Sequence, residues 1–401
     1  MLLHLFNPEN DLALADGNAN YCAPPSAMKI AYDLSSLPLW FAEDDDFVLL
    51  ADNLHKKYYD VISQTFPLPQ IYTSNDADII TKCSPWGWSL QIRRRFENLG
   101  FSDNQLQSVE SIKLLRELSN RRTTIKILEN LANNGVDVPQ LPQYITNLDE
   151  VEKFICSMPL SVIKAPWSGS GKGIAWGLGR KEIPVEHFAK GVIRRQGGIL
   201  CEKFLNKVVD FAMEFYCNNG KITFAGYSLF KSTKGVYSGN ILASDKDIEE
   251  FLDSYKSTTS LLEIKTKIIS VLENVFSDFQ YEGYFGVDMM IYCDEQNIYR
   301  INPCVELNLR MNMGASSRIF YNKFVEKGNI GVFKVEFYKD KGEALKKSSE
   351  LKIKYPLLFK NGKICSGYMN LSPIDEDTQY SASVIIDVFK NQNSLSSLYN
   401  R

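Results

Sequence analysis

The stretch Leu160–Gly177, LSVIKAPWSGSGKGIAWG, most constrains how this chain can fold. It begins with the short β-branched run Val162–Ile163, which is typical of a buried strand, and Lys164 follows directly. The loop Ser168–Gly173 leads into a second apolar run, Ile174–Trp176. Glycines let successive backbone N–H groups turn toward one anion. The pattern predicts strand, loop and strand, with the loop either holding a polyphosphate or forming a hairpin turn of small residues.

Three common nucleotide-binding loops do not match this stretch. A Walker A loop needs glycine where Pro166 stands and serine or threonine where Gly173 stands. A dinucleotide fingerprint needs a helix after its glycines, and the residues from Ile174 onward favour a strand. A kinase glycine loop precedes its lysine, whereas Lys164 comes before this loop.

Length and charge exclude several classes of protein. A chain of 401 residues is long for one core, so we expect two or three packed units. The formal net charge of −3 does not favour bulk binding to nucleic acid or to an anionic membrane. The eight cysteines form no CxxC pair, which predicts reduced thiols and a cytoplasmic location. With only three histidines, a zinc site or a histidine-based triad is not expected.

Residues 1–115 are expected to form an α/β unit. Strands are predicted at Leu2–Phe6, Phe47–Ala51 and Asp78–Thr81, with amphipathic segments between them. The first strand is followed by two polar segments, Asn7–Asp11 and Asp16–Tyr21. Ligands of open α/β sheets bind beyond the carboxyl ends of strands, so these segments either line a substrate cleft or form simple turns.

Farther along, periodicity predicts helices over 108–120, 123–134, 147–157, 248–255 and 261–279, and strands over 199–205, 210–216 and 225–230. In the strand over 210–216, alternation places Asp210 and Glu214 on one face and Phe211 and Phe215 on the other. The Ser/Gly/Lys-rich segment 231–240 is predicted to be a mobile lid.

A second informative stretch carries acidic residues on two predicted strands. Asp288 interrupts the apolar run 284–292, and Glu306, Asn308 and Arg310 alternate in the next run. If that run is extended, the three side chains project from one face. An all-oxygen set of Asp288, Glu306 and Asn308 suits Mg²⁺ beside nucleotide phosphates. The alternative is an ion pair between Glu306 and Arg310 on a solvated face.

Together and in this order, the two stretches resemble the ATP-grasp superfamily over about residues 116–325. The resemblance implies an α/β fold of mixed α+β character, in which an N-terminal pre-grasp domain (1–115) precedes a two-lobed ATP-grasp domain. The lobes would span 116–200, with the glycine loop, and 201–325, with the metal site. Residues 326–401 would form a C-terminal extension, to which no role is assigned.

The resemblance also implies roles for individual residues. Lys164 would hold the α- and β-phosphates of ATP, and Glu202 with the backbone of Phe204 and Leu205 would read the adenine. Asp210, or alternatively Glu214, would meet the ribose. The loop that would cover the β- and γ-phosphates consists of Ser168, Gly169, Ser170, Gly171, Lys172 and Gly173.

Near the reacting groups, Asp288, Glu306 and Asn308 would hold Mg²⁺, and Arg310 would face the reacting carboxylate. Arg121 stands where the family usually has a second phosphate-binding lysine. Arg300–Pro303 resembles a second copy of the Glu-x-Asn-Pro pattern with arginine in place of glutamate, and Glu306 is preferred because its acid is intact.

The implied function is that of an ATP-dependent ligase. It would join a carboxylate, on a small molecule or a peptide, to an amine or a thiol through an acyl-phosphate, and would release ADP and phosphate. Lys164 and Arg310 are the predicted catalytic residues, and ATP and Mg²⁺ are the predicted cofactors. The alternatives are a nucleotide-binding module without catalysis and a phosphotransferase acting on a small molecule. The sequence does not indicate the oligomeric state.

Overall fold

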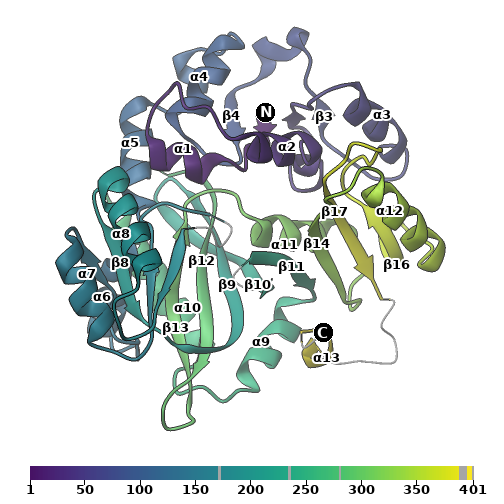
Figure 1. Cartoon of the computed structure of the whole chain (residues 1–401). Coiled ribbons are helices and arrows are strands. Elements are labelled where there is room, and N and C mark those ends of the chain that lie inside the picture. The colour runs from purple at the N-terminus through teal and green to yellow at the C-terminus, as the bar shows by residue number, and fades with distance from the viewer. Residues whose placement is uncertain (170–172, 234–235, 280, 388–394, 400–401) are drawn as a thin grey trace.

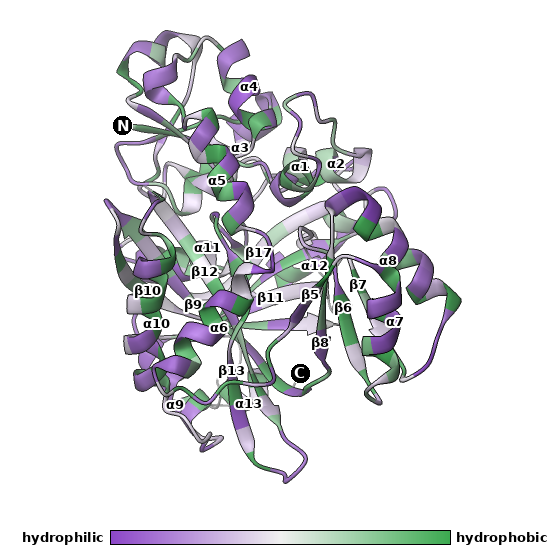
Figure 2. Cartoon of the chain, turned by 90° about the vertical axis from the view of Figure 1, so that its left-hand side faces the viewer, coloured by the Kyte–Doolittle hydropathy of each residue, from purple (hydrophilic) through white to green (hydrophobic). Residues whose placement is uncertain are grey.

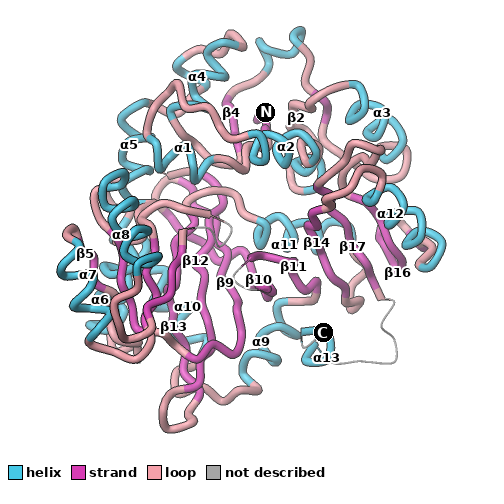
Figure 3. Tube along the Cα trace, viewed as in Figure 1, coloured by secondary structure: helices cyan, strands magenta, loops and turns pink. Residues whose placement is uncertain are grey.

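The computed structural model describes residues 1–169, 173–233, 236–279, 281–387 and 395–399. Its described strands form three sheets, with helices placed around them (Figures 1 and 3). Within these residues, no helix is both long and apolar enough to cross a lipid bilayer.

The N-terminal unit, at the top of Figure 1, contains a parallel sheet of order β3-β2-β1-β4. Its strands are β1 (Leu2–Leu5), β2 (Phe47–Val48), β3 (Gln70–Ile71) and β4 (Lys82–Pro85). The strand predicted at Asp78–Thr81 is wrong, because Ser74–Ile79 forms a 3₁₀ helix capped by Thr73, and the strand begins only at Lys82. The helices around this sheet are α1 (Asn10–Asp16), α2 (Pro25–Asp33), α3 (Asn53–Ile62) and α4 (Leu90–Asn98), and Leu37–Trp40 and Asp103–Gln105 form further 3₁₀ turns.

The next unit has an antiparallel sheet of order β5-β8-β6-β7. Its strands are β5 (Gln143–Ile145), β6 (Ser161–Lys164), β7 (Ile174–Gly177) and β8 (Ile199–Lys203). Helices α7 (Leu148–Cys156) and α8 (Ile183–Gln196) cover the face that carries Ile163 and Cys201. In Figure 2 hydrophilic and hydrophobic residues lie side by side along α8, as expected of a helix with one buried face. The predicted sequence of strand, loop and strand is confirmed.

A third sheet contains nine strands among the described residues, in the order β13-β12-β9-β10-β11-β14-β17-β16-β15. Its first half consists of β9 (Asn206–Asn218), β10 (Lys221–Thr233), β11 (Val236–Leu242), β12 (Gly283–Cys293) and β13 (Tyr299–Asn308). Its second half consists of β14 (Gly331–Phe337), β15 (Leu358–Lys360), β16 (Lys363–Asn370) and β17 (Tyr380–Ile386). The remaining described helices are α5 (Val109–Leu118), α6 (Thr123–Asn133), α9 (Asp245–Asp253), α10 (Leu261–Val275), α11 (Met313–Phe324), α12 (Glu343–Lys354) and α13 (Leu395–Tyr399).

The predicted mobile lid at 231–240 is wrong for its described residues. They complete β10 and form most of β11, which pairs with β10 on one side and with β14 on the other. Small polar residues give no hydrophobic signal, but a strand between two neighbours needs only its backbone N–H and C=O groups to pair. Residues 234 and 235 lie outside the described part of the chain.

The predicted alternation along β9 is confirmed and separates two environments. Phe211, Met213 and Phe215 are fully buried in the core that includes α10. Ala212 and Glu214 lie on the opposite face, where α11 packs against β9, β10 and β12. This second face carries the polar residues of the candidate site.

A second core joins the two ends of the chain. It includes Phe6 and Trp40 from the N-terminal unit, Phe320 from α11 and Val384 from β17. The indole N–H of Trp40 also donates to the carbonyl of Leu371 over 2.8 Å. Residues 326–387 therefore extend the central sheet and pack on the N-terminal unit, and the boundaries predicted at 115/116 and 325/326 stay predictions.

Candidate active site

Lys164 and Glu202 face each other across β6 and β8. In this register Val162 is opposite Glu202 and Lys164 is opposite Leu200, so both charged side chains lie on one face of the sheet. Their side chains form a largely buried ion pair. A buried charge is costly without a partner, so the pair accounts for charged residues inside an apolar sheet. It also places the predicted phosphate lysine beside the predicted adenine acid.

The base of the glycine loop is held closed by backbone contacts. The N–H of Ala165 donates to the carbonyl of Gly173 over 2.8 Å, just beyond the last pair of β6 and β7. Gly173 has φ +77°, a conformation that L side chains rarely adopt, and a Cβ there would lie 2.6 Å from Oγ of Ser168. Ser168 and Gly169 are described, whereas Ser170, Gly171 and Lys172 lie outside the described residues.

Arg121 connects the loop to the predicted metal site. Its Nη1 donates to the carbonyl of Ala165 (2.6 Å) and to Oγ of Ser168 (2.5 Å), and its Nη2 donates to the carbonyl of Ser168 (2.9 Å). The same Nη2 lies 2.7 Å from Oε1 of Glu306. Arg121 precedes α6 and is 5% exposed. A planar guanidinium can make all these contacts at once, which an ammonium cannot.

The three predicted metal ligands lie on neighbouring strands. Asp288 of β12 is directly opposite Glu306 of β13, and Asn308 is two residues farther along the same strand. Burial, and then the negative charge of Glu306, raise the pKa of Asp288 to about 7. Two carboxylates and an amide offer only hard oxygen donors, which fits Mg²⁺. Among the described residues no group of three or more His, Cys, Asp or Glu side chains gathers for a metal, so the amide of Asn308 would complete this set.

Arg310 binds a carboxylate from the N-terminal unit. Its Nε and Nη2 donate to the two carboxylate oxygens of Asp11, over 2.8 and 2.7 Å. Burial raises the pKa of Asp11, but the charge and hydrogen bonds of Arg310 outweigh burial and hold this pKa below its usual value. The alternative pairing of Glu306 with Arg310 is not observed, since Glu306 pairs with Arg121.

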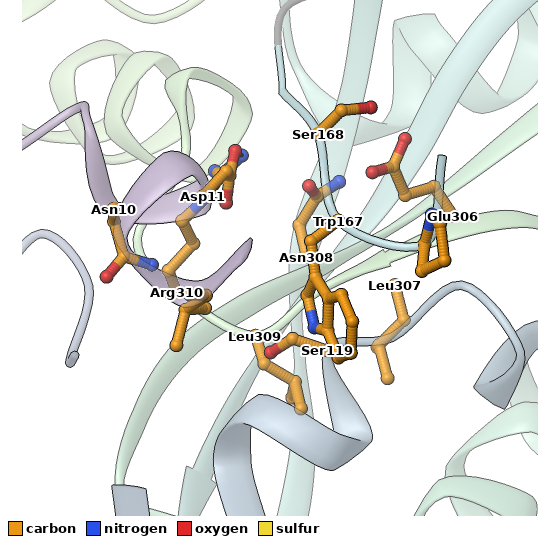
Figure 4. Close-up of a pocket in the computed structure, with 12 residues that line it drawn as sticks. Asn10, Asp11, Ser119, Trp167, Ser168, Glu306, Leu307, Asn308, Leu309 and Arg310 are labelled. Atoms are coloured by element: carbon orange, nitrogen blue, oxygen red, sulfur yellow. Dashed lines mark hydrogen bonds and ion pairs between the residues drawn. The ribbon is translucent and has the colours of Figure 1, made fainter. Parts of the chain in front are cut away.

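Figure 4 shows one small pocket whose lining includes Asp11, Ser168, Glu306, Asn308 and Arg310. Asp11 points toward Arg310, while Ser168, Glu306 and Asn308 lie together on its other side. A Cβ on Gly169 would lie 2.2 Å from Oδ2 of Asp11, so the glycine loop packs directly on α1. The polar segment after the first predicted strand therefore lines the candidate site through Asn10 and Asp11.

The predicted adenine hinge is partly committed to other backbone contacts. The N–H of Phe204 donates to the carbonyl of Leu160 (3.2 Å), and the carbonyl of Leu205 accepts from Lys207 (2.8 Å). The ring of Phe204 meets the half-exposed indole of Trp176 edge-on, with the ring centroids 5.8 Å apart. Reading adenine would thus be left to the carbonyl of Phe204 and the N–H of Leu205.

Asp210 and Glu214, the two candidates for the ribose, lie on the same strand in different settings. Asp210 accepts hydrogen bonds from Lys207 and Ser232. Glu214 is 1% exposed, and its Oε2 accepts from the amide of Asn312 over 2.8 Å.

Sequence reasoning assigned no site role to Asn312 or Trp176, and it included Asp11 only as part of a polar segment that either lines a substrate cleft or forms turns. A signal existed for Asp11, because it lies in the polar segment after the first strand. Asn312 is visible only as the residue that caps α11, and its contact with Glu214 joins segments 98 residues apart. Trp176 and Lys164 lie on the same face of the sheet, but this can be recognised only from the register of β6 and β7.

Comparison with known proteins identifies the fold. No family model matches the chain. The chain is similar to N5-carboxyaminoimidazole synthetase from Staphylococcus aureus, with a TM-score of 0.52 and 13% identity. This match covers all of the present chain and 96% of the synthetase chain. Biotin carboxylase from Campylobacter jejuni is similar over 96% of this chain and 87% of its own, with a TM-score of 0.50 and 12% identity. Both are ATP-grasp enzymes, and the chain has the ATP-grasp fold, as the resemblance implied.

The chain is also similar in sequence to a protein whose function its name does not state. An uncharacterized protein of Methanocaldococcus jannaschii is 24% identical over 192 residues, which are 48% of this chain. The match spans 42% of that protein, so the chain covers less than half of its relative.

Proposed function

We propose that this protein is an ATP-dependent ligase that joins a carboxylate to an amine or a thiol through an acyl-phosphate, with release of ADP and phosphate. The observation that carries the proposal is the direct opposition of Asp288 and Glu306 on β12 and β13, with Arg121 paired to Glu306 and with the charge of Arg310 acting on both carboxylates. Solved structures with this fold include the Staphylococcus aureus synthetase complexed with ADP.

The residues have complementary tasks in this proposal. Lys164 and Arg121 would neutralise the charge of the phosphates. The glycine loop, beginning at Ser168, would cover the phosphates. Mg²⁺ held by Asp288, Glu306 and Asn308 would balance the remaining charge of the phosphates. Arg310 keeps its Nε edge on Asp11, and its Nη1 donates to the carbonyl of Met311 over 3.3 Å. The N–H groups that remain on Nη1 and Nη2 would receive the substrate carboxylate.

Phosphoryl transfer then depends mainly on alignment and on charge neutralisation. The carboxylate oxygen attacks the γ-phosphorus and ADP leaves. The phosphate on the acyl carbon is a good leaving group, so a nucleophile can displace it. This chain's residues supply positioning for both steps.

The test measures ADP release with a panel of carboxylic acids, Mg-ATP and hydroxylamine. We expect at least one acid to stimulate ADP release and to yield a hydroxamate, because hydroxylamine traps an acyl-phosphate. Lys164→Ala and Glu306→Ala should abolish both products. Glu295→Ala, in the exposed turn between β12 and β13, is the matched control and should change neither.

The outcomes separate the proposal from its alternatives. ADP release without hydroxamate would indicate a phosphotransferase. Binding of Mg-ATP without any turnover would indicate a binding module. Binding is read from the melting temperature, since ATP at about a hundredfold its dissociation constant adds about 2.7 kcal/mol of stability. Unchanged turnover in Lys164→Ala or Glu306→Ala would contradict the assignment.

A further inference from the structure

A second pocket, of about 380 Å³, opens on the same sheet face beyond the candidate metal site. Its lining includes Glu214 and Tyr216 of β9, Thr223 of β10, Tyr284 of β12, and Arg318 and Lys323 of α11. The rings of Tyr216 and Tyr284 meet edge-on, with their centroids 4.8 Å apart, and form an aromatic wall. The space is large enough for a small organic molecule, and the proposed ligase function leaves it without an occupant.

The fold makes room for the carboxylate of Glu214. A Cβ on Gly314 of α11 would lie 2.0 Å from Oε1 of Glu214, and one on Gly286 of β12 would lie 2.5 Å from Oε2. Two different elements thus have glycine where any side chain would displace this carboxylate. A carboxylate buried at such a cost to its surroundings indicates a role beyond packing.

The charges that line the pocket are not equivalent. Arg318 donates to the carbonyls of Tyr227 and Ala243, and its charge lies 3.5 Å from Asp245. The ammonium of Lys323 donates to the carbonyl of Ala42 and to Glu43. Both cations are therefore engaged by other groups.

Glu214, by contrast, has a neutral partner. The amide of Asn312 donates to its Oε2, and no ion pair to Glu214 forms among the described residues. The charges of Arg310 and Arg318 act on Glu214 from a distance, without forming an ion pair with it. When Glu214 is ionised, its negative charge beside aromatic rings favours a cationic or amine-bearing ligand.

We propose that this pocket binds the amine substrate of the ligase, with Glu214 receiving the amino group and with Tyr216 and Tyr284 contacting the body of the molecule. The inference rests on the proposed function and narrows its nucleophile to an amine that carries an apolar or aromatic portion.

The pocket adjoins the reacting centre. Glu214 is opposite Gly286 and Ala212 is opposite Asp288, so Glu214 and Asp288 are diagonal neighbours on one face. Asn312, which holds Glu214, follows Arg310 by two residues. An amine on Glu214 would therefore lie beside the proposed carboxylate site.

The position also suits proton transfer. Burial raises the pKa of Glu214 to about 8, and the charged groups that face it are Asp288 of β12, Arg310 after β13 and Arg318 of α11. The phenol of Tyr237 on β11 faces the carboxylate as well. A carboxylate with such a pKa is ionised above about pH 8, where it can accept a proton from an ammonium group.

The step balances as follows. The substrate ammonium gives one proton to the Glu214 carboxylate and becomes a neutral amine. Its lone pair attacks the acyl carbon, the C–N bond forms and the C–O bond to phosphate breaks, with the electron pair leaving on phosphate. The second amine proton leaves with the released phosphate, and Glu214 later returns its proton to solvent.

The experiment compares three probes of one shape in calorimetric titrations of the whole chain without nucleotide, at about pH 9, where Glu214 is ionised. The probes are phenethylamine, 2-phenylethanol and phenylacetate. We expect phenethylamine to bind about tenfold more tightly than the alcohol, because one charge-assisted hydrogen bond contributes at least that factor. Phenylacetate should bind most weakly.

Two variants test the residues. Glu214→Gln keeps the shape and should lose the preference for the amine, whereas Glu295→Gln, in the exposed turn between β12 and β13, should keep it. Thr223→Lys adds a cation to the exposed rim, so it should reverse the preference toward phenylacetate even if Glu214→Gln fails to fold.

Equal binding of the three probes, absence of binding, or a preference for phenylacetate in the native chain would overturn the inference. So would an unchanged preference in Glu214→Gln or in Thr223→Lys. Absence of Mg-ATP binding to the native chain, measured separately, would overturn the proposed ligase function instead. The amine titrations contain no nucleotide, so the two failures are distinguishable.

Discussion

At the scale of single residues, the candidate site is a set of opposite charges that neutralise one another. Glu306 is paired with Arg121, Arg310 with Asp11 and Lys164 with Glu202. Each pair joins segments distant in sequence, and each contains at least one residue with a predicted role toward ATP, Mg²⁺ or substrate. The internal partners keep these charges compensated inside the protein, which would otherwise be costly. When ATP, Mg²⁺ or substrate binds, each would replace an internal partner of the same sign of charge.

Arg121→Lys tests how much the guanidinium contributes. Lysine keeps the charge but cannot contact Ala165, Ser168 and Glu306 together, so buried acceptors lose their donors. Glu306 is partly exposed, so we expect a loss of about 2 kcal/mol in the free energy of unfolding, below the range for fully buried pairs. Urea unfolding followed by circular dichroism measures this loss.

The adjacent Arg122 is the matched control. It is half-exposed and pairs with Glu117 on the surface, so Arg122→Lys should change stability by less than about 0.5 kcal/mol. Equal effects of the two substitutions would show that the contacts of Arg121 contribute no more than a surface pair.

At the scale of elements, register decides which residues meet. The pairing of β12 with β13 brings Asp288 to Glu306, and a shift of one residue would turn one of them to the opposite face. Capping likewise decides where helices begin. Asp52 precedes α3 and accepts from the N–H groups of Leu54 (3.0 Å) and His55 (3.2 Å).

The cap of α3 should make stability depend on acid. Burial raises the pKa of Asp52, but hydrogen bonds from His55 and Tyr32 outweigh it and lower this pKa to about 2. A carboxyl with a lowered pKa stabilises the fold above its unfolded pKa of about 3.9, and this stabilisation is lost as the pH falls toward the folded value. Asp52→Asn keeps a capping oxygen but has no charge to lose.

We therefore expect the native chain to be more stable than Asp52→Asn by up to about 1 kcal/mol near neutral pH, since the carboxylate is partly exposed. The gap should narrow below about pH 4. Urea unfolding between pH 3 and 7 measures it, with the exposed Asp60→Asn on the same helix as control. A gap that stays constant over this range would contradict the prediction.

At the scale of the whole molecule, the last part of the chain completes the central sheet. β14, β16 and β17 continue it from β11, and their side chains Phe333, Ile364 and Val384 are fully buried in the core shared with the N-terminal unit. The chain ends are thus joined through one hydrophobic core.

Ending the chain after Val325 should therefore abolish cooperative folding. Each buried apolar side chain contributes about 1.5–3 kcal/mol, and removing the three just named with their neighbours exceeds the usual total stability of about 5–15 kcal/mol. Thermal unfolding followed by circular dichroism is the measurement. Lys346→Ala with Lys347→Ala, two exposed residues of α12, is the control and should melt like the native chain. A cooperative transition in the chain 1–325 would show that the ATP-grasp region folds without its extension.

The sequence by itself determined the features that depend on interactions and patterns between residues close together in the chain. Spacing predicted the strands on both sides of the glycine loop, the alternation along β9 and the polar set on β12 and β13, because side-chain periodicity is local. It was misleading at 231–240, where composition resembles a loop although two neighbouring strands supply the pairing. At Asp78–Thr81 a capped 3₁₀ turn replaced the predicted strand.

Only the tertiary structure decided which charges meet. Asp11 reaches Arg310 across 299 residues, Arg121 reaches Glu306 across 185, and Asn312 reaches Glu214 across 98. No local pattern encodes such contacts, since they depend on the register of strands and on how α1 and α11 pack against the sheet. The pocket beside Glu214 has the same origin, because its lining comes from β9, β10, β12 and α11, which meet only in the folded chain.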